Sequence, residues 1–364
     1  MTEPDSPSPN ALARFAAQRL AFAPLMFQAC RALRDLGLLE LVALRRDGGL
    51  SAAEGVAATG LDRYAAELLL EAGLASGLLS LNDTAEEPRF FITRMGHYWL
   101  RDPLTRVNAE FNHHVCYKPA FSLRESLLEG RAAGLPSIGA NGARTVYEAL
   151  HALPDEVRTA WLDFDHYYSD GVFEDCARRV LSKADATIVD IGGNTGLFAR
   201  TCIEGGARHV TLVDHPGTLA LAKEKLCDLE GRLSFAARDV LDESAAFPEG
   251  ADVYWLSQFL DCFSEAQVRS ILSRVRVAMR RDSRVFILET FWDQQRHEAA
   301  RFCVIGTSLY FACVANGCSR MYHSKVMKRL VAEAGLRVVS EDSRVGLAHT
   351  LLECGLAEND GAPA

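Results

Sequence analysis

The sequence lacks the features that define several common classes of protein. None of its runs approaches the ~18 apolar residues that a membrane-spanning helix needs. Residues 1–9, MTEPDSPSP, have neither the basic nor the apolar region of a signal peptide. Acidic residues outnumber basic ones, 48 to 39, and the net charge of −9 disfavours binding to nucleic acid or anionic membrane. We therefore expect a cytoplasmic protein with no nucleic-acid partner and no membrane association.

Cysteine patterns typical of zinc sites are missing as well. The 10 cysteines include no C-x-x-C pair, and Cys303, Cys313 and Cys318 lack the spacing of zinc ligands. His113 and His114 are adjacent, so on a helix or a strand they point in different directions. We expect reduced thiols in a cytosolic protein and no metal site.

The chain of 364 residues is long enough for two domains. Residues 15–153 are predicted to form a mostly helical domain, and residues 154–356 a domain of alternating strands and helices. The boundary is expected near Leu153-Pro154. The acidic, proline-rich residues 1–14 are predicted to be a disordered tail, and residues 357–364 a second tail.

The helical half has the pattern of a winged helix. An apolar-periodic stretch over 22–42 is followed by Ser51 and Glu54, which form a capping box at the start of the next helix. A third helix is predicted over 61–73 and a short strand over 89–93. The helix that would read DNA begins DRYAAELLLE, and its three acids against one base would repel phosphates. The charge favours a dimerisation or packing module over a transcription factor.

The second half is predicted to form a parallel sheet with crossover helices. The expected strands are 186–191, 209–213, 233–237, 253–257, 284–290, 337–340 and 348–354. Ligands bind at the carboxyl ends of such strands. Five predicted strands are followed there by polar residues or glycine, namely Gly192, Asp214, Asp239, Gln258 and Glu289. We therefore expect one binding site at this edge of the sheet.

A glycine-rich turn follows the first of these strands. It contains Asp190, Gly192, Gly193, Asn194 and Gly196. Glycines allow a tight turn and close approach of a ligand to the backbone, and asparagine tolerates positive φ. Asp214 follows at close to the ~20 residues expected for an acid that accepts hydrogen bonds from ribose. A dinucleotide loop requires glycine where this chain has Asn194, which disfavours a NAD-dependent dehydrogenase.

Four motifs in order resemble class I methyltransferases that depend on S-adenosylmethionine (SAM). They are VDIGGNTG at 189–196, VDHP at 213–216, RDV at 238–240 and AGL at 334–336. The chain is similar, from about Leu25 to Cys354, to the plant caffeate-type and bacterial small-molecule O-methyltransferases. The resemblance implies an α/β fold, with a Rossmann-like SAM-methyltransferase sheet and a mostly α winged-helix dimerisation domain. It also implies SAM as cofactor, S-adenosylhomocysteine as product, and a homodimer through the N-terminal domain.

The same resemblance assigns cofactor contacts to the strand ends. Asp214 is expected to hold the ribose and Asp239 to contact the adenine side. The full expected set of cofactor-binding residues is Asp190, Gly192, Gly193, Asn194, Gly196, Asp214, His215, Asp239, Val240, Ser257 and Gln258.

The catalytic segment departs from the family pattern L-H-D-W-x-D-E, whose histidine deprotonates the acceptor hydroxyl. This chain reads FLDCFSE at 259–265, with Asp261 in place of the histidine. A carboxylate acts as a general base only where burial or a like charge raises its pKa toward neutrality. Asp261 is therefore predicted to be the base; orienting the acceptor or capping a helix are the alternatives. Glu289 matches the family glutamate that flanks the histidine.

A second family glutamate is missing, because the chain has RMYH at 320–323 where it is expected. Tyr322 or His323 is the alternative source of a base, and histidine has a suitable pKa. A histidine that merely starts a helix is the competing interpretation. The predicted catalytic residues are Asp261, Glu289 and His323.

Aromatic residues before the glycine turn and after the fifth strand predict an aromatic pocket. They include Phe164, Tyr167, Phe291 and Trp292. The predicted acceptor contacts are His166, Tyr168, Tyr310, Phe311 and Tyr322. Any single aromatic can instead belong to the core, but as a set they favour a flat, apolar or phenolic acceptor.

These patterns together predict methyl transfer from SAM to an aromatic small molecule in bacterial secondary metabolism. Alignment of acceptor and methyl group supplies much of the catalysis in such a reaction. O-methylation is the favoured reaction, and C-methylation of an aromatic ring is the alternative. A non-catalytic SAM-binding protein also stays open, because the family histidine is replaced.

Overall fold

The computed structural model describes residues 8–84, 87–181, 183 and 185–357. The chain divides into two units between Ala109 and Glu110. The predicted boundary at Leu153-Pro154 therefore differs from the observed one. The reason is packing: buried residues between Phe111 and Leu153 share a hydrophobic cluster with Val157 and Tyr310 of the second unit.

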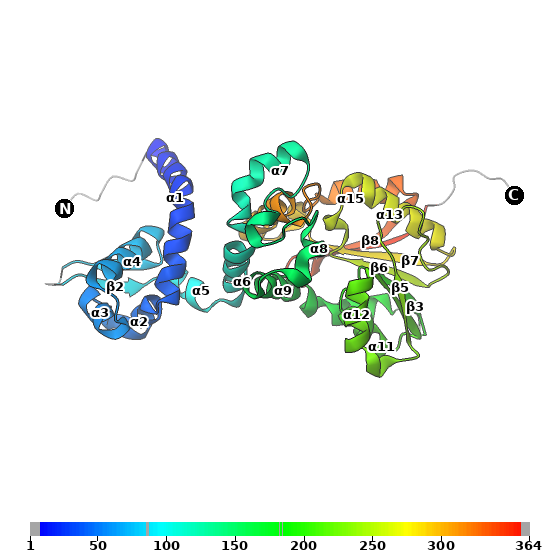
Figure 1. Ribbon diagram of the computed structural model, residues 1–364, viewed down its shortest axis with the longest axis horizontal. Helices are drawn as coiled ribbons and strands as arrows, with labels where there is room; N and C mark the ends of the chain where they lie inside the picture. The colour runs from blue at the N-terminus through cyan, green and yellow to red at the C-terminus, as the bar shows by residue number, and fades with distance from the viewer. Residues whose placement is uncertain (1–7, 85–86, 182, 184, 358–364) are drawn as a thin grey trace. The chain divides into compact units, whose positions relative to one another are not determined.

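The first unit is built mainly from helices. Its elements are α1 (Pro9–Asp35), α2 (Leu38–Arg45), α3 (Ala52–Thr59), α4 (Arg63–Ser76), β1 (Leu79–Asn82), β2 (Arg89–Ile92), α5 (Arg94–Arg101) and α6 (Pro103–Phe111), which reaches the division. Figure 1 shows α1 to α4 with the short strands beside them. The predicted capping box of Ser51 and Glu54 is confirmed at the start of α3, and β1 pairs with β2 as an antiparallel wing.

Two details of the first unit correct the sequence-based expectations. Residues 9–14, predicted to be disordered, are helical, because Ser8 caps α1 by accepting a hydrogen bond from Ala11; residues 1–7 lie outside the described residues. The apolar stretch over 22–42 is two helices rather than one. Gly37 separates them with a φ of +83°, a conformation that glycine adopts without steric cost.

The second unit begins with a helical segment and continues as an α/β domain. Its strands are β3 (Thr187–Ile191), β4 (His209–Asp214), β5 (Leu233–Ala237), β6 (Val253–Ser257), β7 (Arg284–Glu289), β8 (Leu336–Val345) and β9 (His349–Leu356). Its α-helices are α7 (Leu123–Glu129), α8 (Val146–Ala149), α9 (Asp155–Ser169), α10 (Phe173–Val180), α11 (Leu197–Glu204), α12 (Pro216–Lys225), α13 (Glu265–Ala278), α14 (Glu298–Tyr310) and α15 (Ser324–Glu333).

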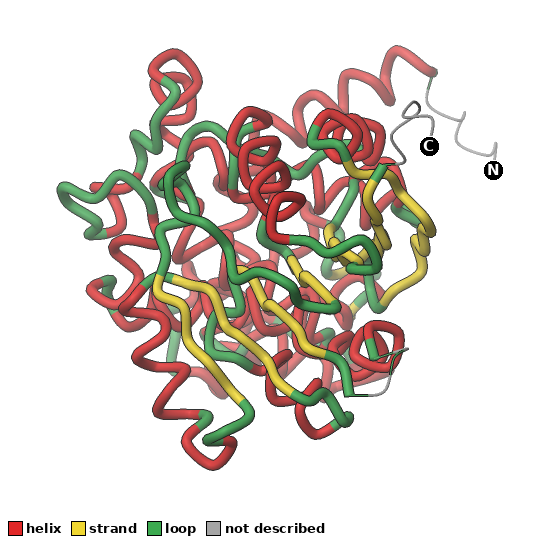
Figure 2. Tube along the Cα trace, turned by 90° about the vertical axis from the view of Figure 1, so that its right-hand side faces the viewer, coloured by secondary structure: helices red, strands yellow, loops and turns green. Residues whose placement is uncertain are grey.

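The strands form one seven-stranded sheet in the order β5-β4-β3-β6-β7-β9-β8. Figure 2 draws the strands in yellow among the helices in red. Strands β3 to β7 are parallel, and the predicted α/β class is confirmed. The expectation of a wholly parallel sheet is wrong for the last two strands: β9 is antiparallel to both β7 and β8. The chain from Gly346 to Ala348 is too short for the crossover that a parallel pair requires.

Two hydrophobic clusters fill the faces of the sheet. One includes Val268, Leu272 and Val275 of α13 and Leu330 of α15. The other contains residues of α10, α11 and α12, including Phe198, whose ring stacks on Trp255 at 4.0 Å. Helices therefore cover both faces (Figure 1), and the carboxyl ends of the parallel strands remain as the edge where ligands bind.

One expectation about hydrophobic runs needs correction. Among the described residues, the window Glu298–Ala315 is long and apolar enough to cross a membrane by length and composition. The residues Tyr310 to Ala315 at its end are buried in the cluster that also holds Val157. Over the whole window only 39% is buried, and Phe302, Ile305 and Leu309 on α14 are exposed.

Candidate active site

The glycine-rich turn joins β3 to α11 and takes the backbone through three residues of positive φ. These are Gly192 at +77°, Asn194 at +49° and Gly196 at +83°. A Cβ on Gly192 would lie 2.2 Å from the ring of Phe259, so only glycine fits there. Asn194 adopts the left-handed conformation that the sequence analysis expected it to tolerate.

Asp214, the last residue of β4, fastens this turn to the neighbouring strand. Its Oδ2 accepts a hydrogen bond from the Asn194 N–H at 3.0 Å, and its Oδ1 accepts one from the His215 N–H at 2.7 Å. Burial raises the pKa of Asp214 and these hydrogen bonds oppose the rise. A carboxylate has about four lone-pair positions, so further hydroxyl donors can still be accepted.

A cavity opens beside the turn. It is lined by Asp165, His166, Ser169, Asp170, Phe173, Asp190, Gly192, Gly193, Asn194, Thr195, Leu197, Phe198, Trp255, Ser257 and Gln258. Three buried polar atoms on this lining, Asp190 Oδ2, Ser257 Oγ and Gln258 Nε2, make no hydrogen bond with any described residue. Because leaving buried polar atoms unpaired is costly, this donor and acceptor set fits a polar ligand such as the amino-acid end of SAM.

Asp239 and Val240 lie one strand further along the edge. The Arg238 N–H donates to the Asp214 carbonyl at 3.0 Å, which places the end of β5 beside the end of β4. Asp239 Oδ1 accepts from the Leu241 N–H at 2.9 Å, while Val240 is buried in the core. The structure thus brings the predicted cofactor residues to consecutive strand ends, although the cavity itself is lined only by those near the glycine turn.

Glu289 at the end of β7 holds the segment that carries Asp261. Its Oε1 accepts hydrogen bonds from the N–H groups of Phe259 at 3.1 Å and Leu260 at 2.7 Å. Asp261 is 5% exposed and Glu289 is 1% exposed. Burial, with the like charge of Asp165 adding to it, raises the pKa of Asp261 to about 7. Burial and the charge of Asp261 raise the pKa of Glu289 as well.

Asp165 on α9 is a third carboxyl group at this site, and the sequence analysis did not select it. Burial raises its pKa to about 6. Asp165 lines the cavity beside the glycine turn and also acts on the charge of Asp261. The position of Asp165 among aromatic residues, in DFDHYY at 163–168, is the sequence feature that could have identified it. Only its neighbours His166 and Tyr168 were predicted to be site residues.

A chain of hydrogen bonds reaches Asp261 from α8. The Cys262 thiol donates to Asp261 Oδ1 at 3.5 Å, and the Tyr147 hydroxyl lies 3.0 Å from Cys262 Sγ. Since the thiol hydrogen is directed to Asp261, the Tyr147 hydroxyl is the donor to sulfur. The sequence analysis missed Tyr147, because no local spacing connects position 147 with position 261.

Several predicted acceptor residues lie in one aromatic cluster. Phe164 stacks on Phe111 with ring centroids 3.9 Å apart, and Tyr310 lies 5.1 Å from Phe111. The Trp161 ring N–H donates to the Tyr310 hydroxyl at 2.7 Å. Tyr168 packs 5.0 Å from Phe164.

Phe311 belongs to the same cluster, with its ring centroid 5.2 Å from that of Tyr310. Tyr322, 2% exposed, donates its hydroxyl to the Phe263 carbonyl at 2.6 Å. His166 lines the cavity of the glycine turn and contacts Asp170 at 3.2 Å.

His323 starts α15. Its Nδ1 accepts from the Lys325 N–H at 3.1 Å and lies 3.3 Å from Asp293. Among the contacts of the described residues, none joins His323 to Asp261, and the helix-start interpretation fits its position. Within the same residues, no group of three or more His, Cys, Asp or Glu side chains has the arrangement of a metal site.

Two family models match the chain. A model described as an O-methyltransferase domain matches residues 164–337, and one described as a Dimerisation2-like domain matches residues 14–88. The second unit therefore contains an O-methyltransferase domain. The N-terminal unit accordingly contains a dimerisation domain.

Proteins similar to this chain occur in bacteria and vertebrates. O-methyltransferase SfmM3 of Streptomyces lavendulae is 30% identical over 179 residues, which cover 47% of this chain and 52% of that protein. Acetylserotonin O-methyltransferase of Bos taurus is 27% identical over 284 residues, which cover 74% of this chain and 76% of that protein. Phenazine-1-carboxylate N-methyltransferase of Pseudomonas aeruginosa is also 30% identical, and the match covers 53% of that protein. The chain thus spans about half the length of SfmM3 and of this second relative.

Solved structures share the fold. The SAM-dependent methyltransferase SibL superposes with a TM-score of 0.70 at 23% identity, covering 94% of this chain and 99% of SibL. Human N-acetylserotonin methyltransferase, solved with SAM, superposes with a TM-score of 0.64 at 18% identity, covering 98% and 100% of the two chains. The Rossmann-like SAM-methyltransferase fold expected from the sequence is therefore confirmed.

Proposed function

We propose that this protein transfers a methyl group from SAM to an aromatic small molecule of bacterial secondary metabolism. The observation that carries the proposal is the cavity between α9 and the glycine turn, where Asp190, Ser257 and Gln258 present unpaired polar atoms. Incubation with SAM and a panel of phenols tests it. Formation of S-adenosylhomocysteine together with a methylated phenol is the expected result.

Each part of the cofactor has candidate partners on the strand ends. The unpaired atoms of Asp190, Ser257 and Gln258 suit the amino-acid end, which brings an ammonium and a carboxylate. Asp214 is placed to accept from the ribose hydroxyls, with His215 beside it at the start of α12. Asp239 and Val240 at the end of β5 are proposed for the adenine side, and the close turn at 192–196 for the backbone contacts.

Asp261 is proposed as the general base of O-methylation. When bound, SAM would supply a methyl group on a positively charged sulfur. The acceptor oxygen would attack the methyl carbon in line, and the sulfur would leave with the electrons of the broken bond. With its pKa raised to about 7, Asp261 is partly ionised at neutral pH and is a far better base toward a phenol of pKa ~10 than an ordinary aspartate of pKa ~4. Glu289 positions the segment through its two backbone hydrogen bonds. His323 is the alternative base that we retain for testing.

The aromatic cluster around Tyr310 and Phe164 supports a flat acceptor. Aromatic rings stack on planar ligands and exclude water from them. One protein of the same fold, the O-methyltransferase NcsB1, was solved with SAM and 2-hydroxy-5-methyl naphthoic acid, with a TM-score of 0.61 and 21% identity. We propose five residues as acceptor contacts, namely His166, Tyr168, Tyr310, Phe311 and Tyr322.

C-methylation of an aromatic ring is the second candidate reaction. It is retained because Asp261 replaces the histidine that serves O-methylation in the family pattern. A ring carbon ortho to a phenol needs only an oriented phenol and a weak base to lose its proton after the methyl group has been added. Carbon-13 NMR of the product distinguishes the two reactions. A methyl carbon bonded to oxygen supports O-methylation, and one bonded to a ring carbon overturns it.

We further propose a homodimer that assembles through the N-terminal unit and works in the cytoplasm. α1 exposes large apolar side chains, namely Leu12, Phe15, Leu20, Phe22 and Leu25. Exposed apolar surface of this kind is typical of a protein interface. The 10 cysteines, all reduced in the structure, suit the cytoplasm.

A further inference from the structure

The connection between β5 and β6 carries Asp239 and Val240 on a segment without regular structure. Residues 238–252, all of which the structure describes, contain no helix and no strand. Turns account for part of its order: the Asp242 N–H donates to the Asp239 carbonyl at 3.0 Å, and the Ala245 N–H donates to the Asp242 carbonyl at 3.1 Å. A segment of this length needs further contacts to keep one conformation.

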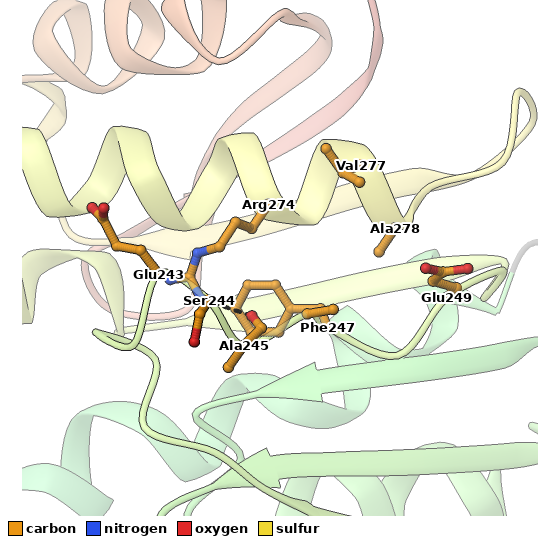
Figure 3. Close-up of a pocket in the computed structure, with 9 residues that line it drawn as sticks. Glu243, Ser244, Ala245, Phe247, Glu249, Arg274, Val277 and Ala278 are labelled. Carbon is orange, nitrogen blue, oxygen red and sulfur yellow. Dashed lines mark hydrogen bonds between the residues drawn. The ribbon is translucent and has the colours of Figure 1, made fainter.

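Arg274 of α13 supplies those contacts from outside the segment. Its Nη1 donates to the carbonyls of Asp242 at 3.0 Å and Ala245 at 3.2 Å, and its Nη2 donates to the carbonyl of Val240. Its Cζ lies 5.0 Å from the centroid of the Phe247 ring. Figure 3 shows this side chain reaching from its helix to the loop, on the wall of a small hollow.

The guanidinium group suits this task because of its shape. Arginine presents donors in a rigid planar fork, stays charged, and lies favourably over an aromatic ring. The three accepting carbonyls are spread over residues 240 to 245, so one side chain fixes several points of the backbone at once. Phe247, 3% exposed, anchors the same loop in the core.

The position of this loop matters for the cofactor site. The loop starts beside Asp214, because the Arg238 N–H donates to the Asp214 carbonyl at 3.0 Å. A loop held in one conformation loses less entropy when a ligand binds against it. Movement of the loop would therefore displace Asp239 and Val240 from the strand edge that also bears Asp214.

We infer that Arg274 is a positioning residue for the cofactor: it holds the carbonyls of Val240, Asp242 and Ala245, and so keeps the loop that receives the adenine side in place. The inference rests on the proposed function, since it takes SAM as the ligand of this edge. The contacts of Arg274 described above all go to the loop.

The test compares Arg274→Met and Arg274→Lys with Arg269→Met, a control on the same helix whose arginine pairs with the exposed Glu333. The Kd of S-adenosylhomocysteine is measured by calorimetry, and amide hydrogen exchange is followed over residues 239–246. Arg274→Met is expected to raise the Kd about tenfold or more and to speed exchange in the loop. Arg274→Lys, which keeps the charge without the fork, is expected to lie between, and Arg269→Met to match the wild type.

Kinetics add a readout that general destabilisation would not give. In Arg274→Met, the KM for SAM is expected to rise while kcat at saturating SAM stays near the wild-type value, because bound cofactor is still presented to the same acceptor groups. If Arg274→Met does not fold, Arg274→Lys carries the test, since an ammonium donates from one nitrogen and cannot reproduce the planar fork whose two nitrogens serve the three carbonyls.

Unchanged Kd and unchanged loop exchange in a folded Arg274 variant overturn the inference alone. A wild-type protein that binds no S-adenosylhomocysteine overturns the proposed function and this inference together, so the two failures are distinguishable.

Discussion

Asp261 occupies the position where the family pattern has its catalytic histidine, and its surroundings give the carboxylate a different chemistry from that of an exposed aspartate. Burial and Asp165 raise its pKa to about 7. The Cys262 thiol donates to it, and Glu289 holds the backbone of the two residues that precede it. A buried aspartate with such neighbours can take a proton near neutral pH, which a solvent-exposed carboxylate does poorly.

Replacing Asp261 with asparagine tests this role. Asp261→Asn is expected to leave SAM binding unchanged and to slow methyl transfer by about 10²- to 10⁴-fold, the usual contribution of a general base. The wild-type rate is expected to rise with pH through about 7, because only the ionised carboxylate accepts a proton, and the variant to lose this rise. Single-turnover rates from pH 5.5 to 8.5 provide the measurement. Full wild-type rate in Asp261→Asn would rule out the base assignment.

Asp190 gives a prediction about stability. Burial and the charge of Asp214 raise its pKa to about 8, far above the value of an unfolded aspartate. The folded protein therefore holds a proton that the unfolded chain releases above pH ~4. The stability from this proton is complete below that pH and is lost as the pH rises through about 8.

The Tm of the cofactor-free protein is accordingly expected to fall between pH 5 and pH 8. Asp190→Asn cannot titrate, so its Tm should fall less over the same range. Scanning calorimetry at several pH values compares the two. Parallel curves for the two proteins would contradict the assignment of a raised pKa to Asp190.

The turn between β3 and α11 is the element on which the cofactor site depends. A side chain on Gly192 would meet the Phe259 ring at 2.2 Å and would also face a φ of +77°. Gly192→Ala is therefore expected to push away the segment that leads to Asp261 and to raise the Kd of SAM by at least about tenfold. Gly217→Ala on α12 is the matched control, since no atom lies within 4 Å of the added Cβ. Equal SAM affinity in both variants would contradict this account of the turn.

At the level of elements, the sequence predicted the seven strands of the sheet to within a few residues, because buried strands and the turns between them leave a clear local pattern. It missed β1, although β2, which has the same length, was predicted. It also missed the direction of β9, which is antiparallel to both of its neighbours, β7 and β8. The sequence-based prediction ended β8 at residue 340, whereas the strand continues to Val345. The short connection between β8 and β9 that requires an antiparallel pair was therefore not recognised.

The catalytic cluster shows why the site was only partly predictable. Residues at strand ends, such as Asp214 and Glu289, follow from the fold class alone. Tyr147, Asp165 and Asp261 come together from α8, α9 and the loop after β6, and no sequence spacing specifies that meeting. The raised pKa of Asp261 depends on that packing.

At the level of the whole molecule, the two units carry different parts of the function. The second unit holds the strand ends and the carboxyl cluster, and the first exposes the apolar side chains of α1. We expect the full chain to sediment as a dimer at micromolar concentration. A double variant, Leu20→Glu and Leu25→Glu, places charges on side chains that are 78% and 69% exposed, and should yield monomers without a loss of Tm in the second unit.

Leu347→Glu is the control for this experiment, since that leucine is 60% exposed in the turn between β8 and β9. It should leave the dimer intact. A wild-type protein that sediments as a monomer would show that the apolar face of α1 has another partner.

The most direct test of the central claim is calorimetric titration of the purified protein, stripped of bound ligand, with SAM. The account predicts one site per chain with a Kd in the micromolar range, roughly −8 kcal/mol of binding free energy. It also predicts that Asp214→Ala abolishes binding, whereas Asp228→Ala, which removes an exposed ion pair with Arg200, leaves it unchanged. Absence of binding to the wild-type protein would contradict the account and reduce the likeness to SAM-dependent methyltransferases to one of fold.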